Sequence, residues 1–125
     1  KKMHEAGVNH RDYYLCHFLL NAPGSKSLKF KPILHLIDLH RAQVRKSVPR
    51  RWLVKDLGGL LFSAIEKNLT TRDLLRFIRE YDSRPLRKSL SEDAVFWREV
   101  VDRAIKLWMR SHDTAPEHLK KMLLL

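Results

Sequence analysis

The chain has 125 residues, of which 44% are hydrophobic and 31% are charged, and this length suffices for one compact domain with its own core. Its formal net charge of +11 at pH 7 predicts attraction to anions such as nucleic acid, phosphate-bearing lipids or acidic glycans, unless the charge serves only solubility. The single cysteine, Cys16, excludes an internal disulfide bond, and no apolar run approaches the roughly 20 residues of a membrane-spanning helix.

The first residues are predicted to form the end of a helix and then a loop. Residues 1–6 are typical of the last turn or two of a helix, and Gly7 suits the left-handed position just past a helix end. We place the tripeptide His10-Arg11-Asp12, which follows shortly afterwards, in the loop.

Two short strands are expected next, at residues 18–20 and at residues 33–37. Both runs are apolar, and the second contains β-branched isoleucines. Residues 21–27 between them are dense in turn-forming residues. The pattern therefore predicts a β-hairpin with Asp38 at the exit of its second strand.

A basic and irregular stretch follows the hairpin and contains Pro49. After Pro49, apolar residues recur at three- and four-residue spacings as far as Ile65, which predicts a helix that ends near Asn68. Gly58-Gly59 lies in the middle of this helix and weakens it by about 1 kcal/mol per glycine. Such a pair indicates either the close approach of another backbone or a kink.

The remainder of the chain is predicted to be helical. Thr70 and Asp73 form a capping box, and Pro85 ends the helix that they start, whose inward residues are Leu74, Leu75, Phe77, Ile78 and Tyr81. Residues 89–92 offer a cap for a longer helix over about residues 92–111, with Val95, Trp97, Val100, Val101, Ala104, Ile105 and Trp108 facing inward. A short last helix begins at residues 114–117 and ends in the apolar residues 122–125.

The order of polar residues around the hairpin favours phosphoryl transfer. That reaction uses one acidic group to orient the attacking hydroxyl and another to hold the Mg²⁺ that bridges the nucleotide phosphates. By itself, His10-Arg11-Asp12 is more typical of a solvated charged turn. However, His17 can bind a metal through its imidazole, and the hairpin then delivers Asp38, so the two aspartates occur in the order that phosphate chemistry needs.

These motifs resemble the catalytic lobe of protein-kinase-like enzymes. Residues 10–17 match the pattern H-R-D-x-x-x-x-N except that His17 stands where asparagine is usual, and Asp38-Leu39-His40 stands where Asp-Phe-Gly is usual. In detail, the chain resembles the lipopolysaccharide core heptose(I) kinase family, the WaaP/RfaP type. The resemblance covers most of residues 3–88 and is carried by residues 4–18, 37–43, 49–52, 55–57 and 69–77.

The resemblance implies a fold and a set of roles. The fold is α+β and mostly helical, with residues 1–125 forming a C-terminal lobe that is inactive alone, since no glycine-rich loop or strand lysine precedes Lys1. Asp12 would be the catalytic base and Asp38 would bind the Mg²⁺ of Mg²⁺-ATP. His17 would replace the second metal ligand, either directly, through a water, or only by a hydrogen bond to the loop, because imidazole suits Mg²⁺ less well than oxygen does.

The implied function is ATP-dependent phosphorylation of a heptose in the lipopolysaccharide inner core. The enzyme would be a cytoplasmic sugar kinase, peripheral at the inner face of the bacterial inner membrane, whose N-terminal lobe binds the nucleotide. Its acidic acceptor, or an anionic membrane surface, would bind basic residues, foremost Arg41, Arg45, Arg50 and Arg51, although such a charge run is often only solvated. No nucleic acid is expected under this hypothesis, whereas the alternative is a non-catalytic basic helical module that binds nucleic acid or anionic lipid.

Other constellations are less favoured. Cys16 and His17 would point to opposite faces of a strand and so make a poor nucleophile and base. His35, Asp38 and His40 could bind a metal, yet their spacing matches no strong zinc pattern. The three tryptophans, at helical spacing, are predicted to be core residues (Trp52, Trp97 and Trp108).

Overall fold

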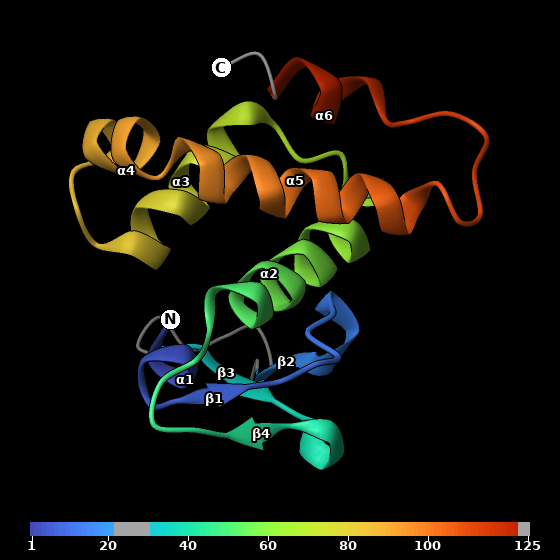
Figure 1. Ribbon diagram of the computed structural model, residues 1–125. Helices are drawn as coiled ribbons and strands as arrows, with labels where there is room; N and C mark the ends of the chain where they lie inside the picture. Colours follow the sequence, from blue (N-terminus) through green and yellow to red (C-terminus); the bar gives the residue numbers. More distant parts are fainter. Residues whose placement is uncertain (22–30, 123–125) are drawn as a thin grey trace.

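The computed structural model describes residues 1–21 and 31–122 and is α+β and mostly helical, as predicted (Figure 1). The elements are α1 (Lys2–Glu5), β1 (Val8–Asn9), η1 (Leu15–His17), β2 (Phe18–Asn21), β3 (Ile33–Leu36), η2 (Leu39–Arg41), β4 (Gln43–Val44), α2 (Arg50–Ala64), η3 (Ile65–Lys67), α3 (Thr71–Asp82), α4 (Leu86–Glu92), α5 (Ala94–Trp108) and α6 (Glu117–Met122). Within the described ranges, every helix is too short or too polar to span a bilayer.

Two short antiparallel ribbons lie on one side of α2 (Figure 1). The expected pairing of β2 with β3 is present, with Phe18 opposite Leu36 and Asn21 opposite Ile33. Residues 22–27, which were expected to form most of the turn, lie outside the described residues. β1 also pairs with β4, in a ribbon that the sequence pattern did not predict because two-residue strands are too short to show an alternation.

Helix α2 is the centre of the molecule, with the ribbons on one side of it and α5 packed across the other side (Figure 1). The core between these helices contains buried Leu57, Trp97 and Val100. A second cluster of buried residues joins η3, α3, α5 and α6 (Ile65, Leu74, Val101 and Leu119). Between α2, α3 and α5 an apolar cavity of about 640 Å³ remains.

The glycine pair in α2 serves close packing rather than a kink, since α2 runs unbroken through it. A Cβ atom at Gly58 would lie 2.5 Å from Cγ of Arg103 and 3.2 Å from the carbonyl oxygen of Val100. Gly58 therefore allows α5 to approach the α2 backbone.

The caps of the later helices agree with prediction in one case and differ in another. In the predicted capping box, the backbone N–H of Asp73 donates to the Thr70 hydroxyl at 3.3 Å, and the N–H of Thr70 donates to the Asp73 carboxylate at 2.9 Å. Residues 89–92, in contrast, lie inside α4, so the expectation of a cap there was wrong. Pro85 stands at the N-cap of α4 with an extended backbone, and the new helix begins at the next residue, Leu86.

The helix expected over residues 92–111 is shorter, because α5 begins at Ala94 and ends at Trp108. Most of its expected inward residues are buried or partly buried, but Val95 is exposed in the first turn, and Phe77 of α3 is also exposed. Both were predicted to face inward, so these two expectations were wrong.

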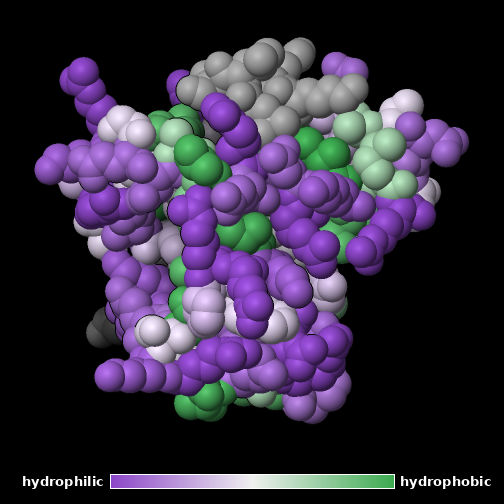
Figure 2. Space-filling view, in the orientation of Figure 1, coloured by the Kyte–Doolittle hydropathy of each residue, from purple (hydrophilic) through white to green (hydrophobic). Residues whose placement is uncertain are grey.

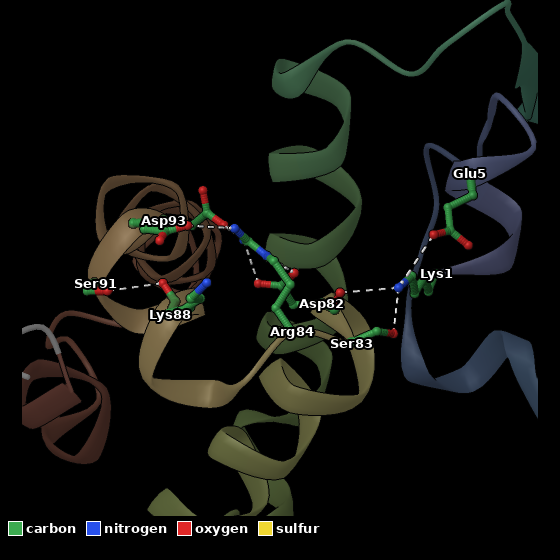
Figure 3. Close-up of polar contacts among 9 residues, drawn as sticks. Lys1, Glu5, Asp82, Ser83, Arg84, Lys88, Ser91 and Asp93 are labelled. Atoms are coloured by element: carbon green, nitrogen blue, oxygen red, sulfur yellow. Dashed lines mark hydrogen bonds and ion pairs between the residues drawn. The ribbon is translucent and has the colours of Figure 1, made fainter.

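A polar network ties the start of the chain to the turn between α3 and α4 (Figure 3). Arg84 donates to both carboxylate oxygens of Asp82 at 2.7 Å, and it also pairs with Glu92 and Asp93. These hydrogen bonds lower the pKa of Asp82. Lys1 Nζ donates to the carbonyl oxygen of Asp82 at 3.2 Å, so the network holds α1 against α3.

Hydrophilic residues cover most of the face in Figure 2, with smaller apolar patches between them. With a net charge of +11, such a surface attracts anionic partners.

Candidate active site

The loop that carries Asp12 is held by a buried carboxylate on α2. Asp56 is only 1% exposed, and its two oxygens accept the backbone N–H groups of His10 at 2.7 Å and Arg11 at 2.9 Å. The Nε2–H of His4 donates to the same carboxylate at 3.0 Å. No role was predicted for Asp56 from the sequence, although an acidic residue on the apolar face of a predicted helix was a signal that could have found it.

The anchor continues from Asp56 through two further elements. The Tyr81 hydroxyl of α3 donates to Nδ1 of His4 at 2.8 Å, in the tautomer in which His4 Nε2–H donates to Asp56. Burial raises the pKa of the Tyr13 hydroxyl to about 12, and the charge of Asp56 adds to that shift. The hydrogen bonds of His4 with Asp56 and Tyr81 thus join α1, α2 and α3.

His10 links this loop to the exit of the hairpin. It is fully buried, its Nε2–H donates to the carbonyl oxygen of Ile37 at 2.9 Å, and its Nδ1 accepts the N–H of Asp12 at 3.2 Å. Arg11 and Asp38 both adopt positive φ values, of 76° and 63°, which are unfavourable for residues with a Cβ. Such backbone strain is often found at functional sites.

The structure brings Asp12, His17 and Asp38 together. The Nδ1–H of His17 donates to the carbonyl oxygen of Asp12 at 2.7 Å, and its Nε2 lies 3.3 Å from Oδ2 of Asp38. With Nδ1 as the donor, a neutral ring presents its Nε2 lone pair to the side of Asp38. Metal-binding histidines are commonly oriented in this way, with the other ring nitrogen donating to a backbone carbonyl. His17 therefore makes the predicted hydrogen bond to the loop, and its Nε2 points toward the proposed metal ligand Asp38.

The donor set fits part of a Mg²⁺ site. Mg²⁺ is usually held by one or two carboxylates, with waters and substrate phosphates as its other ligands. The side chain of Asp38 is partly exposed and also pairs with His40. In the part of the chain that the structure describes, no group of three or more His, Cys, Asp or Glu side chains is arranged to hold a metal alone. The alternative site of His35, Asp38 and His40 is therefore not assembled.

The four basic residues expected to bind substrate have different surroundings. Arg41 donates to Oδ1 of Asp12 at 2.7 Å. Arg45 donates to Oδ1 of Asn9 at 3.2 Å and lies over the Trp52 ring, as Arg51 does. Arg50 pairs with Glu99 of α5 at 3.0 Å. Of the four, only Arg41 contacts an aspartate of the candidate site.

Two expectations about single residues need correction. Cys16 and His17 lie in the 3-10 turn η1 and not on a strand, so the argument from opposite strand faces does not apply, although Cys16 is exposed and His17 faces Asp12. Of the tryptophans, Trp97 is a core residue and Trp108 is partly buried against the second cluster. Trp52 is instead half-buried among cations, with its Nε1–H unpaired.

Comparisons with known proteins identify relatives of this chain. Residues 1–81 match the model of the lipopolysaccharide kinase (Kdo/WaaP) family. The chain is 50% identical over 109 residues to the lipopolysaccharide core heptose(I) kinase WaaP of Pseudomonas aeruginosa, a match over 86% of this chain and 40% of that protein. It is 54% identical over 92 residues to the WaaP of Escherichia coli K12, which covers 73% of this chain and 34% of that protein.

A solved structure, WaaP in complex with acyl carrier protein, superposes with a TM-score of 0.72 at 50% identity. The superposition covers 85% of this chain and 44% of that one. This chain therefore spans less than half the length of the relatives that it matches.

Proposed function

Because the chain belongs to the lipopolysaccharide kinase (Kdo/WaaP) family, we propose that it supplies the catalytic lobe of a sugar kinase. The enzyme would transfer phosphate from ATP to a heptose of the lipopolysaccharide inner core. The observation that carries the proposal is that His17 contacts both the backbone carbonyl of Asp12 and the carboxylate of Asp38, while the buried Asp56 holds the loop that carries Asp12. The name of the relatives, heptose(I) kinase, supports the choice of acceptor.

In this proposal Asp12 is the general base. Its carboxylate would accept the proton of the attacking sugar hydroxyl, a contribution that is typically worth 10²- to 10⁴-fold in rate. Arg41 holds Oδ1 of Asp12 at 2.7 Å and so orients the group. Asp56 fixes the backbone from which Asp12 projects.

Asp38, with His17 beside it, would hold the Mg²⁺ of Mg²⁺-ATP. When bound, that ion would neutralise charge on the phosphate oxygens during transfer. The chain's own contribution would be to hold the Asp38 carboxylate beside His17, and the hydrogen bond from His10 to the Ile37 carbonyl supports this arrangement.

The β2–β3 hairpin supports the proposal that residues 1–125 form a C-terminal lobe. Its cross-strand neighbours Leu20 and Leu34 are 59% and 60% exposed, and Leu19 and Ile33 are exposed beside them. An apolar surface of this kind marks a contact with another part of a protein. A nucleotide-binding N-terminal lobe would cover it, next to Asp38, and the present chain alone would then not bind ATP with micromolar affinity.

The cellular setting is also part of the proposal. A cytoplasmic enzyme, peripheral at the inner face of the inner membrane, would use its basic surface to approach anionic lipid. The solved relative is in complex with an acyl carrier protein, and we extend that partner to the present chain because the match covers 85% of it. Co-purification of the full-length protein with an acyl carrier protein tests this extension.

The test of the central role is Asp12→Asn in the full-length protein. We expect phosphate transfer from labelled ATP to a heptose-containing acceptor to fall by at least about 10²-fold, since the base is removed. The matched control is Asp113→Asn, an exposed aspartate in the loop after α5, which should leave transfer unchanged.

Undiminished transfer by Asp12→Asn, with circular dichroism unaltered, would remove the catalytic role of this residue. Salt-sensitive binding of nucleic acid or anionic vesicles, together with no transfer by the wild type, would favour the non-catalytic basic module instead.

A further inference from the structure

We propose that a basic cavity beside Asp12 binds an acidic substituent, phosphate or carboxylate, of the acceptor and so positions the attacking hydroxyl. The inference rests on the proposed kinase function. The cavity has a volume of about 280 Å³, and the residues that line it include Arg11, Asp12, Arg41, Lys55, Arg103 and Arg110.

The position of the cavity indicates that its ligand is the acceptor rather than the nucleotide. Asp12 is among the lining residues, but His17, Asp38 and the strands of the hairpin are not. The other walls come from the loop that carries Asp12, from Arg41 of η2, from α2, and from α5 with the turn after it. A molecule in this cavity therefore lies beside Asp12, in a recess that the proposed metal ligands do not line.

The charges in the cavity are unbalanced. Five basic side chains line it, and the carboxylate of Asp12 is paired with Arg41. Within residues 1–21 and 31–122, the other four form no ion pair, namely Arg11, Lys55, Arg103 and Arg110. Cations gathered in a recess with low-dielectric walls attract an anion more strongly than the same charges on an open surface.

The same residues carry unpaired hydrogen-bond donors. The Nε–H of Arg11, the Nε1–H of Trp52 and the Nε–H of Arg103 are buried without an acceptor. Each buried donor without a partner costs about 1–3 kcal/mol, so the side chains around the cavity have hydrogen-bonding capacity that the described residues leave unused. Phosphate or carboxylate oxygens in the cavity would neutralise its charge and accept hydrogen bonds from the guanidinium and ammonium groups that line it.

Residues of α2 and α5 form much of the lining of this cavity. Trp52, Lys55 and Gly59 recur at i, i+3 and i+7 on one face of α2, with the Lys55 ammonium 4.3 Å from the centre of the Trp52 ring. Arg103 lies on α5, and Arg110 lies in the turn that follows the end of this helix at Trp108. The absence of a side chain at Gly58 lets Arg103 lie against α2.

The experiment uses the full-length kinase and its acidic acceptor. In each of the single variants Arg103→Gln and Arg110→Gln, we expect the acceptor KM to rise about 10- to 100-fold. This is the effect of losing one hydrogen bond to a charged group. The KM for ATP should stay unchanged. Arg103→Lys, which keeps the charge but loses Nε–H, should give an intermediate acceptor KM, and Lys106→Gln, on the exposed face of α5, should have no effect.

Acceptors that lack one acidic group identify the recognised chemistry. If the cavity binds a phosphate, the effect of Arg103→Gln disappears with dephosphorylated acceptor, and if it binds a carboxylate, the effect disappears with carboxyl-reduced acceptor. An equal effect on an acceptor that lacks both groups, or no effect on the fully acidic one, would overturn the inference.

Failure of the inference can be told apart from failure of the kinase function. Loss of transfer with Asp12→Asn but an unchanged acceptor KM with Arg103→Gln would overturn the cavity's role alone. If the wild type transfers no phosphate, calorimetric titration with the same acidic acceptor still tests the cavity, and equal affinities of wild type and Arg103→Gln would overturn it.

Discussion

Asp56 connects the stability of the molecule to its candidate chemistry. Its buried carboxylate accepts the backbone N–H groups of His10 and Arg11 and the ring N–H of His4. In Asp56→Asn, the amide group cannot accept all of these bonds, and at least one buried donor is left unpaired. We expect a loss of roughly 2–4 kcal/mol in the free energy of unfolding, measured by urea denaturation.

The same variant should reduce phosphate transfer in the full-length protein, because the loop that carries Asp12 loses its anchor. Asp102→Asn, an exposed aspartate of α5, is the control and should unfold like the wild type. An Asp56→Asn variant with unchanged stability and activity would show that the loop does not depend on this carboxylate.

His17 is the residue at which the chain departs from the usual kinase-like pattern, and its role can be measured. If it helps to hold Mg²⁺, His17→Ala should raise the Mg²⁺ concentration for half-maximal transfer by about tenfold. His17→Asn supplies an amide oxygen, which Mg²⁺ prefers, and should restore a low requirement. A Mg²⁺ requirement that is the same in all three proteins would leave only the hydrogen bond to the Asp12 carbonyl as its role.

At the level of elements, the features that were predicted correctly depend on local signals. Turn formers between two apolar runs indicated the β2–β3 pairing, and Thr70 and Asp73 are close enough in sequence to define a capping box. The β1–β4 ribbon pairs Val8 with Val44, which no local pattern reveals. The role of Asp56 likewise depends on a loop 45 residues away in the sequence.

From the packing of α5 on α2, we predict different effects of alanine substitution at Gly58 and Gly59. Gly58→Ala places a Cβ 2.5 Å from Arg103, so we expect overpacking to cost about 1–3 kcal/mol, against about 1 kcal/mol gained in helix propensity. The net result should be a lower Tm. Gly59→Ala is the matched control, since its Cβ would lie 3.3 Å from the nearest atom, a Tyr14 ring carbon, and the propensity gain should offset any strain. Equal Tm values for both variants would contradict this account of the pair.

At the scale of the whole molecule, the sequence predicted a mostly helical lobe with two aspartates around a hairpin, and the family is confirmed. The basic cavity was not predicted, because Trp52 and Arg103 lie on different helices and meet only through packing. The basic residues between positions 41 and 51 suggested one binding surface in the sequence. In the structure they have different partners, since Arg41 contacts Asp12, Arg51 lies over Trp52 and Arg50 contacts Glu99. The charge count alone therefore could not locate the basic cavity.

The exposed hairpin allows a test of how this chain fits into a longer protein. Leu20 and Leu34 face each other across β2 and β3, and both are exposed in the present structure. In the 125-residue chain, the pair Leu20→Ser and Leu34→Ser should change the free energy of unfolding by less than about 0.5 kcal/mol, as surface substitutions usually do. In the full-length protein, the same pair should lower Tm and weaken ATP binding, because a covering lobe loses an apolar contact.

Val44→Ser serves as the control for this comparison, because Val44 is 80% exposed on β4, away from the hairpin. It should be neutral in both proteins. Hydrogen exchange adds a second measurement, since a lobe packed on the hairpin should slow exchange of the β2 and β3 amides in the full-length protein. If the hairpin pair were equally neutral in the long and short proteins, and amide exchange equally fast, the hairpin would be free of any lobe, and its apolar face would have to serve another contact.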